Sequence, residues 1–388
     1  MAASPLVPTP PATRALTVSM FLGSFAWGFA FISLPFYVQA ISTTDAATTL
    51  RWTGWIVGIP SLVTVLTGPV WGRMAAGGDP KRYYVLIQLL QGVGFFGMAA
   101  TGTLFELFVA RFVLGFMGAA STLAFMIAGR EADPAEVRRQ VAAVQMAMTI
   151  GQITGPLGGA IASARLGFRP SFALGGLILL GSAAFVHWGV RLPPRHEPPP
   201  SGHGRMPITD VVVESLIVLA VSTQLFFLTS VLPQILSGLG VPDDGVIEIG
   251  GLLVFVSAAA AGLGAMAVPR LAAVWSERRL VVVLLVGSAA LMVAQALPTG
   301  VWGYTVVRFL QVLWAAPVFP LVVARVVQQR SGSAVGIVNS ARIGASFVGP
   351  VLATSVLAVA PPLILYLVLA AAGLACVPLA LLRARRHE

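Results

Sequence analysis

The sequence predicts an all-α membrane protein in which twelve transmembrane helices form two pseudo-symmetric six-helix bundles. Three observations predict this fold: the composition, the recurring apolar runs and an internal repeat. Of the 388 residues, 57% are hydrophobic and only 10% are charged, whereas a soluble domain has about 25% charged residues. The mean hydropathy is +0.89. Lipid is therefore the solvent for most of the chain.

Apolar runs recur at about the 20-residue length that crosses ~30 Å of hydrocarbon. They occupy residues 16–41, 52–75, 83–102, 105–128, 138–162, 170–190, 209–238, 246–271, 279–297, 301–325, 333–358 and 361–382. These twelve runs predict twelve transmembrane helices.

The second half of the chain repeats the first. SLPFYVQAIS (33–42) recurs as VLPQILSGLG (231–240), ARFVLGFMGAA (110–120) as VRFLQVLWAAP (307–317), and QMAMTIGQITGPLGGA (145–160) as NSARIGASFVGPVLAT (339–354). The matches keep their order, at offsets of 198, 197 and 194 residues. Parallel halves related by an axis along the membrane normal place a substrate site between them, near the middle of the membrane.

Polar segments rich in proline mark the expected domain boundaries. We expect a disordered cytoplasmic tail at 1–15, the first bundle at 16–190, a cytoplasmic linker at 191–207, the second bundle at 208–382 and a cytoplasmic tail at 383–388. The linker, RLPPRHEPPPSGHGRMP, cannot pack as a helix. Its histidines, His196 and His203, are expected to be solvated, so no metal site is predicted.

The arginines predict the orientation, because basic residues stay on the cytoplasmic side. With the N-terminus inside, eighteen lysines and arginines lie in cytoplasmic segments and three, Arg51, Arg165 and Arg169, lie outside. We therefore expect a multi-pass protein of the plasma (bacterial inner) membrane with both termini cytoplasmic. This distribution explains the net charge of +10 through topology and contact with anionic lipids, without a nucleic-acid partner.

Residues 145–160 carry a resemblance to a known family. Gly151, Gly155 and Gly159 lie four residues apart, which places them on one helical face where a neighbouring backbone approaches closely. Pro156 bends that helix. The pattern G-x-x-x-G-P-x-x-G-A resembles the fifth-span antiporter motif of the major facilitator superfamily, in particular its drug/proton antiporter branch. RFVLGFMGAA, from Arg111, is similar to the fourth-span pattern of that family.

The resemblance covers residues 17–382 and implies functional roles. It implies a conformational hinge at Gly151, Gly155, Pro156 and Gly159, with repeat equivalents at Gly349 and Pro350. It links the buried Arg111 to proton coupling. It also implies a cytoplasmic latch in the loop after the second span, although the loop fits the family pattern poorly. The candidates for the latch are Gly72, Arg73, Asp79, Lys81 and Arg82.

Polar residues within the spans are candidate substrate ligands, because a charge near the middle of the bilayer is costly. The candidates are Arg342, Arg111, Arg308, Gln224, Thr223, Trp27, Gln311 and Asn339. Several of them have an alternative role. Arg111 and Arg308 could instead donate to helix-end carbonyls, leaving Arg342 alone. Gln145, Gln152 and Asn339 could form interhelical hydrogen bonds, and Trp27 could serve packing.

Proton coupling requires a group that titrates, and the first span has no acidic residue. Glu214 and Glu106 are the candidates, together with Arg111. Glu214 has an alternative role, because its side chain could snorkel to the cytoplasmic interface.

Enzyme signatures such as a Walker loop or HExxH are missing from the sequence, so we expect neither an enzyme nor a cofactor. We expect a secondary transporter, a monomer surrounded by lipid, that moves a small organic molecule by alternating access, through proton-coupled efflux. The alternatives are an importer or facilitator of a small anionic metabolite, and a non-transporting receptor on the same fold.

Overall fold

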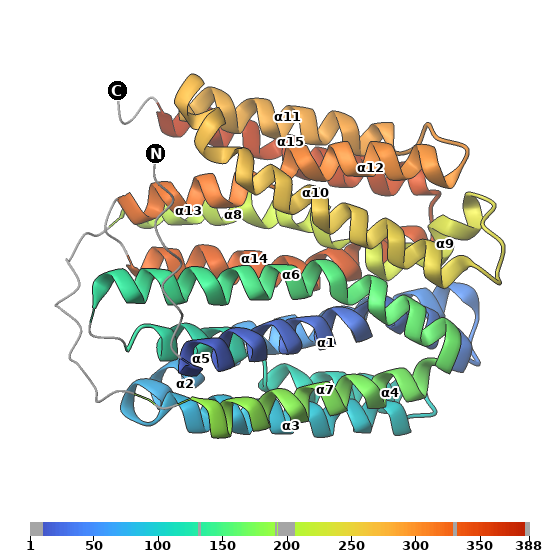
Figure 1. Cartoon of the computed structure of the whole chain (residues 1–388). Coiled ribbons are helices and arrows are strands. Elements are labelled where there is room, and N and C mark those ends of the chain that lie inside the picture. Colours follow the sequence, from blue (N-terminus) through green and yellow to red (C-terminus); the bar gives the residue numbers. More distant parts are fainter. Residues whose placement is uncertain (1–10, 131–132, 191, 193–205, 329–331, 385–388) are drawn as a thin grey trace, which may run out of the picture.

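The computed structural model describes residues 11–130, 133–190, 192, 206–328 and 332–384. These residues form fifteen helices and no strand (Figure 1). The helices are α1 (Pro11–Ile41), α2 (Ala46–Gly77), α3 (Pro80–Ala100), α4 (Leu104–Phe116), α5 (Ala120–Ala128), α6 (Pro134–Leu166), α7 (Phe168–Gly189), α8 (Ile208–Phe226), α9 (Leu228–Gly238), α10 (Val246–Val274), α11 (Glu277–Ala294), α12 (Val301–Ala315), α13 (Val318–Gln328), α14 (Gly332–Leu357) and α15 (Pro362–Ala384).

The fifteen helices make twelve spans, as predicted, because three spans are each broken into two helices. The broken spans are α4 with α5, α8 with α9, and α12 with α13. In the described chain, ten spans are long and apolar enough to cross a membrane, and α11 contributes a shorter apolar stretch, Arg279–Ala294. The twelfth span is α6, which carries more charged and polar residues than the others.

Most span boundaries agree with the predicted ones to within a few residues. The first helix begins at Pro11, ahead of the expected start at residue 16. Most of the predicted linker at 191–207 and parts of both predicted tails lie outside the described residues, so the domain division remains a prediction.

The break between α4 and α5 exposes backbone carbonyls that three side chains of neighbouring spans satisfy. The hydroxyl of Thr64 donates to Gly115 O at 3.0 Å, and the indole of Trp71 donates to Phe116 O at 2.6 Å. The amide of Gln91 donates to Met117 O at 2.5 Å. Because lipid offers no hydrogen bonds, a broken helix persists in a membrane only when its freed carbonyls are satisfied in this way.

Hydrophobic cores differ between the two ends of the molecule. We call the side on which α1 begins and α15 ends the terminal side (left in Figure 1), and the opposite side the far side. On the terminal side, each bundle has its own core, one from residues 15–190 and one from residues 206–376. On the far side, one core joins Ile32, Phe36, Leu50 and Ala160 of the first bundle to helices of the second. A further core, within residues 26–179, belongs to the first bundle alone and also reaches this side.

Glycines allow the two bundles to touch on the far side. A Cβ added to Gly58 of α2 would lie 3.1 Å from Cα of Phe347 in α14. A Cβ on Gly251 of α10 would overlap Ala160 of α6. The rings of Trp55 and Phe347 also meet across this boundary, with 5.4 Å between their centroids. The bundles are thus packed tightly against each other on the far side.

Candidate functional site

Arg111 of α4 is buried and bound to carbonyls of α2. Its Nε donates to Ile56 O at 3.0 Å and its Nη2 donates to Val57 O at 3.1 Å. Pro60 lies four residues after Ile56 and has no N–H, so it frees the carbonyl that Arg111 binds. The guanidinium also lies 5.5 Å from the ring centre of Trp27. These contacts compensate the buried charge without a ligand.

Arg308 of α12, the repeat equivalent of Arg111, binds the end of α8. Its Nη1 donates to Gln224 O at 2.9 Å, and its Nη2 donates to Leu225 O at 2.7 Å. These carbonyls belong to the last turn of α8, where a helix has no partners of its own. The Nη1 also donates to the side chain of Gln311 at 2.7 Å, and the guanidinium lies over the ring of Phe227.

The amides of Gln224 and Gln311 are buried inside the second bundle. Gln311 donates to the side-chain oxygen of Gln224 at 3.3 Å, and Gln224 donates to Leu369 O at 3.0 Å. Gly373 of α15 makes room for this network, since an added Cβ would lie 2.6 Å from the amide nitrogen of Gln224. Thr223 is also buried. The structure therefore groups Gln224 and Gln311 with Arg308.

Trp27 of α1 connects Arg111 to the break in the fourth span. Its indole donates to the side-chain oxygen of Gln91 at 3.1 Å, and Gln91 in turn donates to Met117 O. The ring of Phe95 meets the indole edge-on at 5.5 Å. Trp27 is half-buried, so one part of its ring stays accessible.

Arg342 of α14 differs from the other two deep arginines. Its guanidinium lies 4.5 Å from the ring centre of Phe319. In the part of the chain that the structure describes, no hydrogen-bond acceptor or carboxylate contacts it. Asn339 and Ser346 share its face of α14 at i, i+3 and i+7 spacing; Asn339 is exposed, and the other two are half-buried. We call Asn339, Arg342 and Ser346 the α14 polar face.

A matching polar face lies on α6. Gln145, Thr149 and Gln152 follow i, i+4 and i+7 spacing, and the two glutamines are exposed. The Thr149 hydroxyl donates to Gln145 O at 2.9 Å. We call these three residues the α6 polar face. The sequence offered a signal for it, because Gln145 and Gln152 align with Asn339 and Ser346 at the repeat offset of 194 residues.

Glu214 lies buried in α8, where its Oε1 accepts a hydrogen bond from Nη1 of Arg325 at 2.7 Å. Arg325 comes from α13, so this ion pair joins α8 of one broken span to α13 of another on the terminal side. Asp210, one turn earlier in α8, is also buried. Glu214 was expected from the sequence as a candidate, but its partner Arg325 was not, because its position at the end of an apolar run indicated a cytoplasmic loop.

Glu106 lies at the far side and caps α4. Its carboxylate accepts from the backbone N–H of Gly102 at 2.8 Å and of Thr103 at 3.3 Å. The Thr103 hydroxyl accepts from Glu106 N at 3.2 Å, which completes a capping box. This carboxylate is exposed and already has a structural task.

The glycine face of α6 lies directly against the backbone of α1. A Cβ added to Gly151 or Gly155 would lie 2.6 Å from a backbone oxygen of α1, and one on Gly159 would overlap the carbonyl of Phe29. Pro156 also touches this contact, since its Cδ would lie 3.0 Å from a Cβ on Gly28. Any side chain on the three glycines would force α1 and α6 apart.

The repeat-equivalent positions in α14 are less crowded. A Cβ on Gly349 would lie 3.2 Å from both Phe227 N and Thr223 O, at the break between α8 and α9. The carbonyl of Pro350 faces Gly54 of α2, where an added Cβ would lie 2.9 Å away. Thus Gly349 packs within its bundle and Pro350 packs across the bundle boundary.

The predicted latch residues make local contacts. Asp79 caps α3 by accepting from Lys81 N at 2.9 Å, and it forms an ion pair with Arg82 at 3.4 Å. Arg73 donates to a carbonyl of its own helix at 3.3 Å. At Gly72 an added Cβ would meet nothing within 4 Å. These contacts join residues of α2, α3 and the turn between them.

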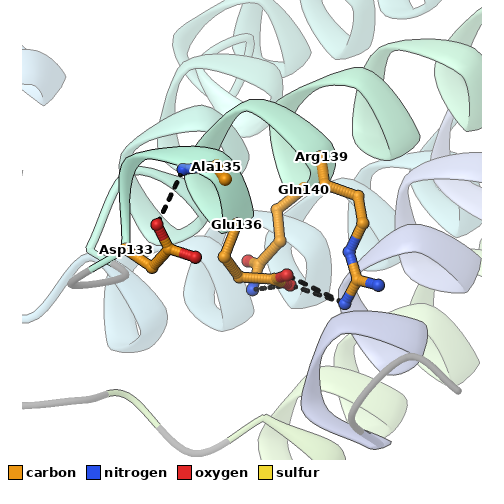
Figure 2. A network of polar contacts seen from close by, with 5 residues as sticks. All are labelled: Asp133, Ala135, Glu136, Arg139 and Gln140. Carbon is orange, nitrogen blue, oxygen red and sulfur yellow. Dashed lines mark hydrogen bonds and ion pairs between the residues drawn. The ribbon is translucent and has the colours of Figure 1, made fainter. Parts of the chain in front are cut away.

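A polar network holds the start of α6 on the terminal side (Figure 2). The carboxylate of Asp133 caps the helix by accepting from Ala135 N at 3.0 Å. Glu136 accepts from Arg139 Nη2 at 2.9 Å and from Gln140 Nε2 at 3.2 Å. Figure 2 shows the three side chains converging on one side of the helix. Such contacts fix the end of the helix that carries the glycine face.

The comparisons with known proteins agree on one family. The sequence model of the Major Facilitator Superfamily matches residues 16–267. The "Uncharacterized MFS-type transporter YuxJ" of Bacillus subtilis is 24% identical over 82% of this chain and 83% of its own length. The "Multidrug resistance protein MdtG" of Salmonella paratyphi A is 22% identical over 76% of each chain. The crystal structure of the nucleoside transporter NupG superposes with a TM-score of 0.75 and 14% identity over 95% of this chain and 98% of its own.

Proposed function

This chain belongs to the Major Facilitator Superfamily, and from that premise we propose that it exports small organic molecules by alternating access in exchange for protons. It is a multi-pass membrane transporter of small molecules and not an enzyme. What we propose beyond this is the direction of transport, its coupling to protons, the kind of substrate, and that the protein acts as a monomer.

The contact between α6 and α1 carries the proposal. Gly151, Gly155 and Gly159 form the motif that resembles the fifth span of drug/proton antiporters, and all three lie against the α1 backbone. A glycine face of this kind allows two closely packed helices to slide against each other, because its three glycines have no side chains that hold the backbones in one register. The name of MdtG, a multidrug resistance protein, supports export as the direction.

The arrangement of the cores supports a state that opens toward the cytoplasm. We propose that the terminal side is cytoplasmic, because the basic residues concentrate there. The bundles have separate cores on that side, whereas a core that both bundles share is found on the far side, next to the first bundle's own core there. Alternating access would reverse this: the shared far-side core would separate while the terminal ends come together.

Glu214 is our proposed coupling residue. It is buried, and protonation of its carboxylate would remove the charge that Arg325 neutralises at 2.7 Å. The ion pair joins α8 to α13, so losing it would loosen the second bundle on the terminal side. Glu106 is less suited to this role, since its carboxylate is exposed and caps a helix. We propose Arg111 as a positioning residue for α2.

Transport into inverted membrane vesicles tests the proposal. Vesicles with an acidic interior should accumulate radiolabelled organic compounds from a panel faster than vesicles lacking this protein, and an uncoupler should abolish the difference. Intact cells should accumulate less of the same compounds. Uptake that ignores the pH gradient would remove proton coupling from the proposal, and accumulation by intact cells would reverse its direction.

The second candidate is import or facilitated passage of a small anionic metabolite. Arg342 favours it, because this deep cation has no anionic partner among the described residues. The same vesicle measurements decide between the two candidates, since a facilitator equilibrates its substrate and an importer concentrates it in intact cells.

A further inference from the structure

The surroundings of α14 divide it into faces with different partners. Val338 and Ala345 are buried within the second bundle. Gly54 and Gly58 of α2 pack against the face that carries Phe347 and Thr354. At 100° per residue, the α14 polar face lies between these two directions. It therefore points to the boundary between the bundles and not to lipid, whereas Ile337, on the opposite side of the helix, is 47% exposed.

The surroundings of α6 divide it into faces in the same way. Its glycine face rests on α1, and Ala160 and Pro156 meet Gly251 of α10. The α6 polar face lies between these two directions by the same helical geometry. The axis that relates the repeats thus brings two polar faces to the same boundary, one from each bundle.

The two faces differ in charge at one position. Gln145 and Gln152 correspond to Asn339 and Ser346, but the residue corresponding to Arg342 is Met148. One face therefore offers a guanidinium among neutral polar groups. At the matching place the other has a flexible, polarisable thioether, which is partly buried against the first-bundle core. A ligand that matches both faces has an anionic end and an apolar body.

Resting on the proposed transport function, we propose that the α6 and α14 polar faces bind an amphipathic organic carboxylate, with Arg342 as the anchor for its carboxylate group. Stacking on Phe319 at 4.5 Å covers one plane of the guanidinium and leaves its N–H edge for two parallel hydrogen bonds to a carboxylate. The asymmetry at Met148 orients the apolar body toward α6.

The charge of the ligand follows from the other two deep arginines. Arg111 and Arg308 each donate to two backbone carbonyls, so they need no anion. Arg342 is then the one deep guanidinium that can neutralise the charge of a ligand. Its single positive charge neutralises a monoanion. A phosphate ester carries about −1.5 to −2 charges at neutral pH, so part of its charge would stay unpaired in a medium of low dielectric constant, which is costly.

Binding of three matched probes to the purified, full-length protein in detergent tests this site. The probes are 2-naphthoate, 2-naphthamide and 2-naphthylmethylammonium, which share an aromatic body and differ in charge. Wild type should prefer naphthoate to naphthamide by about 10- to 100-fold, the effect of charge-assisted hydrogen bonds, and should bind the ammonium weakest. Arg342→Gln should bind naphthoate and naphthamide alike.

Control variants separate the site from general charge and from misfolding. Arg138→Gln removes an exposed arginine of α6 and should leave naphthoate affinity unchanged. Should Arg342→Gln fail to fold, Arg342→Lys keeps the charge but loses the fork, so it should bind naphthoate more weakly than wild type and still prefer it to naphthamide.

Preference for the ammonium, no binding of naphthoate to wild type, or unchanged affinity in Arg342→Gln would overturn the site. These measurements need no gradient. A failure of export in vesicles therefore leaves the binding result standing, and the reverse also holds.

Discussion

At the scale of single residues, the two repeat-equivalent arginines show how a membrane protein satisfies a broken backbone. Arg111 binds the carbonyl that Pro60 frees, and Arg308 binds the last carbonyls of α8. Each guanidinium reaches two acceptors at once, which an ammonium group cannot do in the same geometry. Both side chains thus stabilise distorted helices as well as neutralising their own burial.

Replacement of Arg111 by lysine should therefore lower stability more than the loss of a single neutral hydrogen bond. Arg111→Lys leaves at least one carbonyl of α2 without a donor, which costs about 1–3 kcal/mol. Thermal unfolding in detergent measures the loss, with Arg138→Lys, the same exchange at an exposed arginine of α6, as the control. A melting temperature equal to that of wild type would show that the lysine or water satisfies these carbonyls instead.

The two candidate carboxylates should separate in their effects on pH dependence. Glu214→Gln keeps an oxygen that accepts from Arg325 but cannot ionise, so transport rates should lose their dependence on pH. Glu106→Gln should retain the wild-type pH profile and lose about 0.3–1 kcal/mol of stability, because glutamine still completes the capping box but removes the negative charge at the helix N-terminus. Initial rates in inverted vesicles from pH 5.5 to 8.5 measure the first effect, and thermal unfolding measures the second. The opposite pattern would assign coupling to Glu106.

Charged groups that the structure buries were identifiable from the sequence, but their partners were not. Arg111, Arg308 and Glu214 stood out because charges within apolar runs are rare. Their partners lie far along the chain: the carbonyl of Ile56 is 55 residues from Arg111, and Arg325 is 111 residues from Glu214. Glu106 was different, because Thr103 three residues before it already forms the capping-box signature in the sequence.

At the scale of helices, the glycine face of α6 should tolerate no bulky side chain. Gly155→Leu should abolish transport, because the added side chain would collide with the α1 backbone only 2.6 Å from its Cβ. Gly349→Leu should retain more activity, since the corresponding distance is 3.2 Å. Transport per molecule of inserted protein, from vesicle uptake and immunoblotting, measures both.

Gly97→Leu is the matched control for these variants. Gly97 lies within α3, where an added Cβ would meet nothing within 4 Å, so this variant should transport like wild type. Normal turnover in Gly155→Leu would remove the α1–α6 contact from the mechanism. Loss of activity in Gly97→Leu would mean that leucine is harmful at any glycine of these spans.

The breaks within three spans were not predicted, because a broken span is as apolar as a continuous one and hydropathy does not distinguish them. Runs such as 105–128 and 209–238 are continuously apolar, yet each is divided in the structure. Gly115 and Gly118 could have indicated the first break, and Pro317 the third. At Phe227 the sequence has neither glycine nor proline; this break depends on Arg308 from another span.

At the scale of the whole molecule, the number of spans and the two-bundle arrangement were predictable because lipid restricts the possible folds. Each span must satisfy its own backbone, so apolar length alone counts the helices. The shared far-side core was not predictable in the same way. Under the proposed alternating access, the same sequence packs in at least two arrangements, and its hydropathy is the same in both, so hydropathy does not reveal which helices share a core.

Cysteine labelling should reveal which side of the bundles is open and where the termini lie. Cys376 is the single cysteine and is buried, so Cys376→Ala provides a background without reactive thiols. In this background, Gln145→Cys and Asn339→Cys place one thiol on each polar face. If the terminal side is cytoplasmic and open, a membrane-impermeant maleimide should label both in inverted vesicles and neither in right-side-out vesicles.

Arg51→Cys is the control for the opposite side. Arg51 is exposed at the start of α2 on the far side, so its thiol should react only in right-side-out vesicles. A saturating carboxylate such as 2-naphthoate should slow labelling at Asn339→Cys, because the ligand would cover the α14 polar face, and should leave labelling at Arg51→Cys unchanged. Labelling of the polar faces from the same side as Arg51→Cys would mean that the resting protein opens in the other direction. Labelling of neither face would mean that both lie closed within the bundles, and the order of opening would then begin from an occluded state.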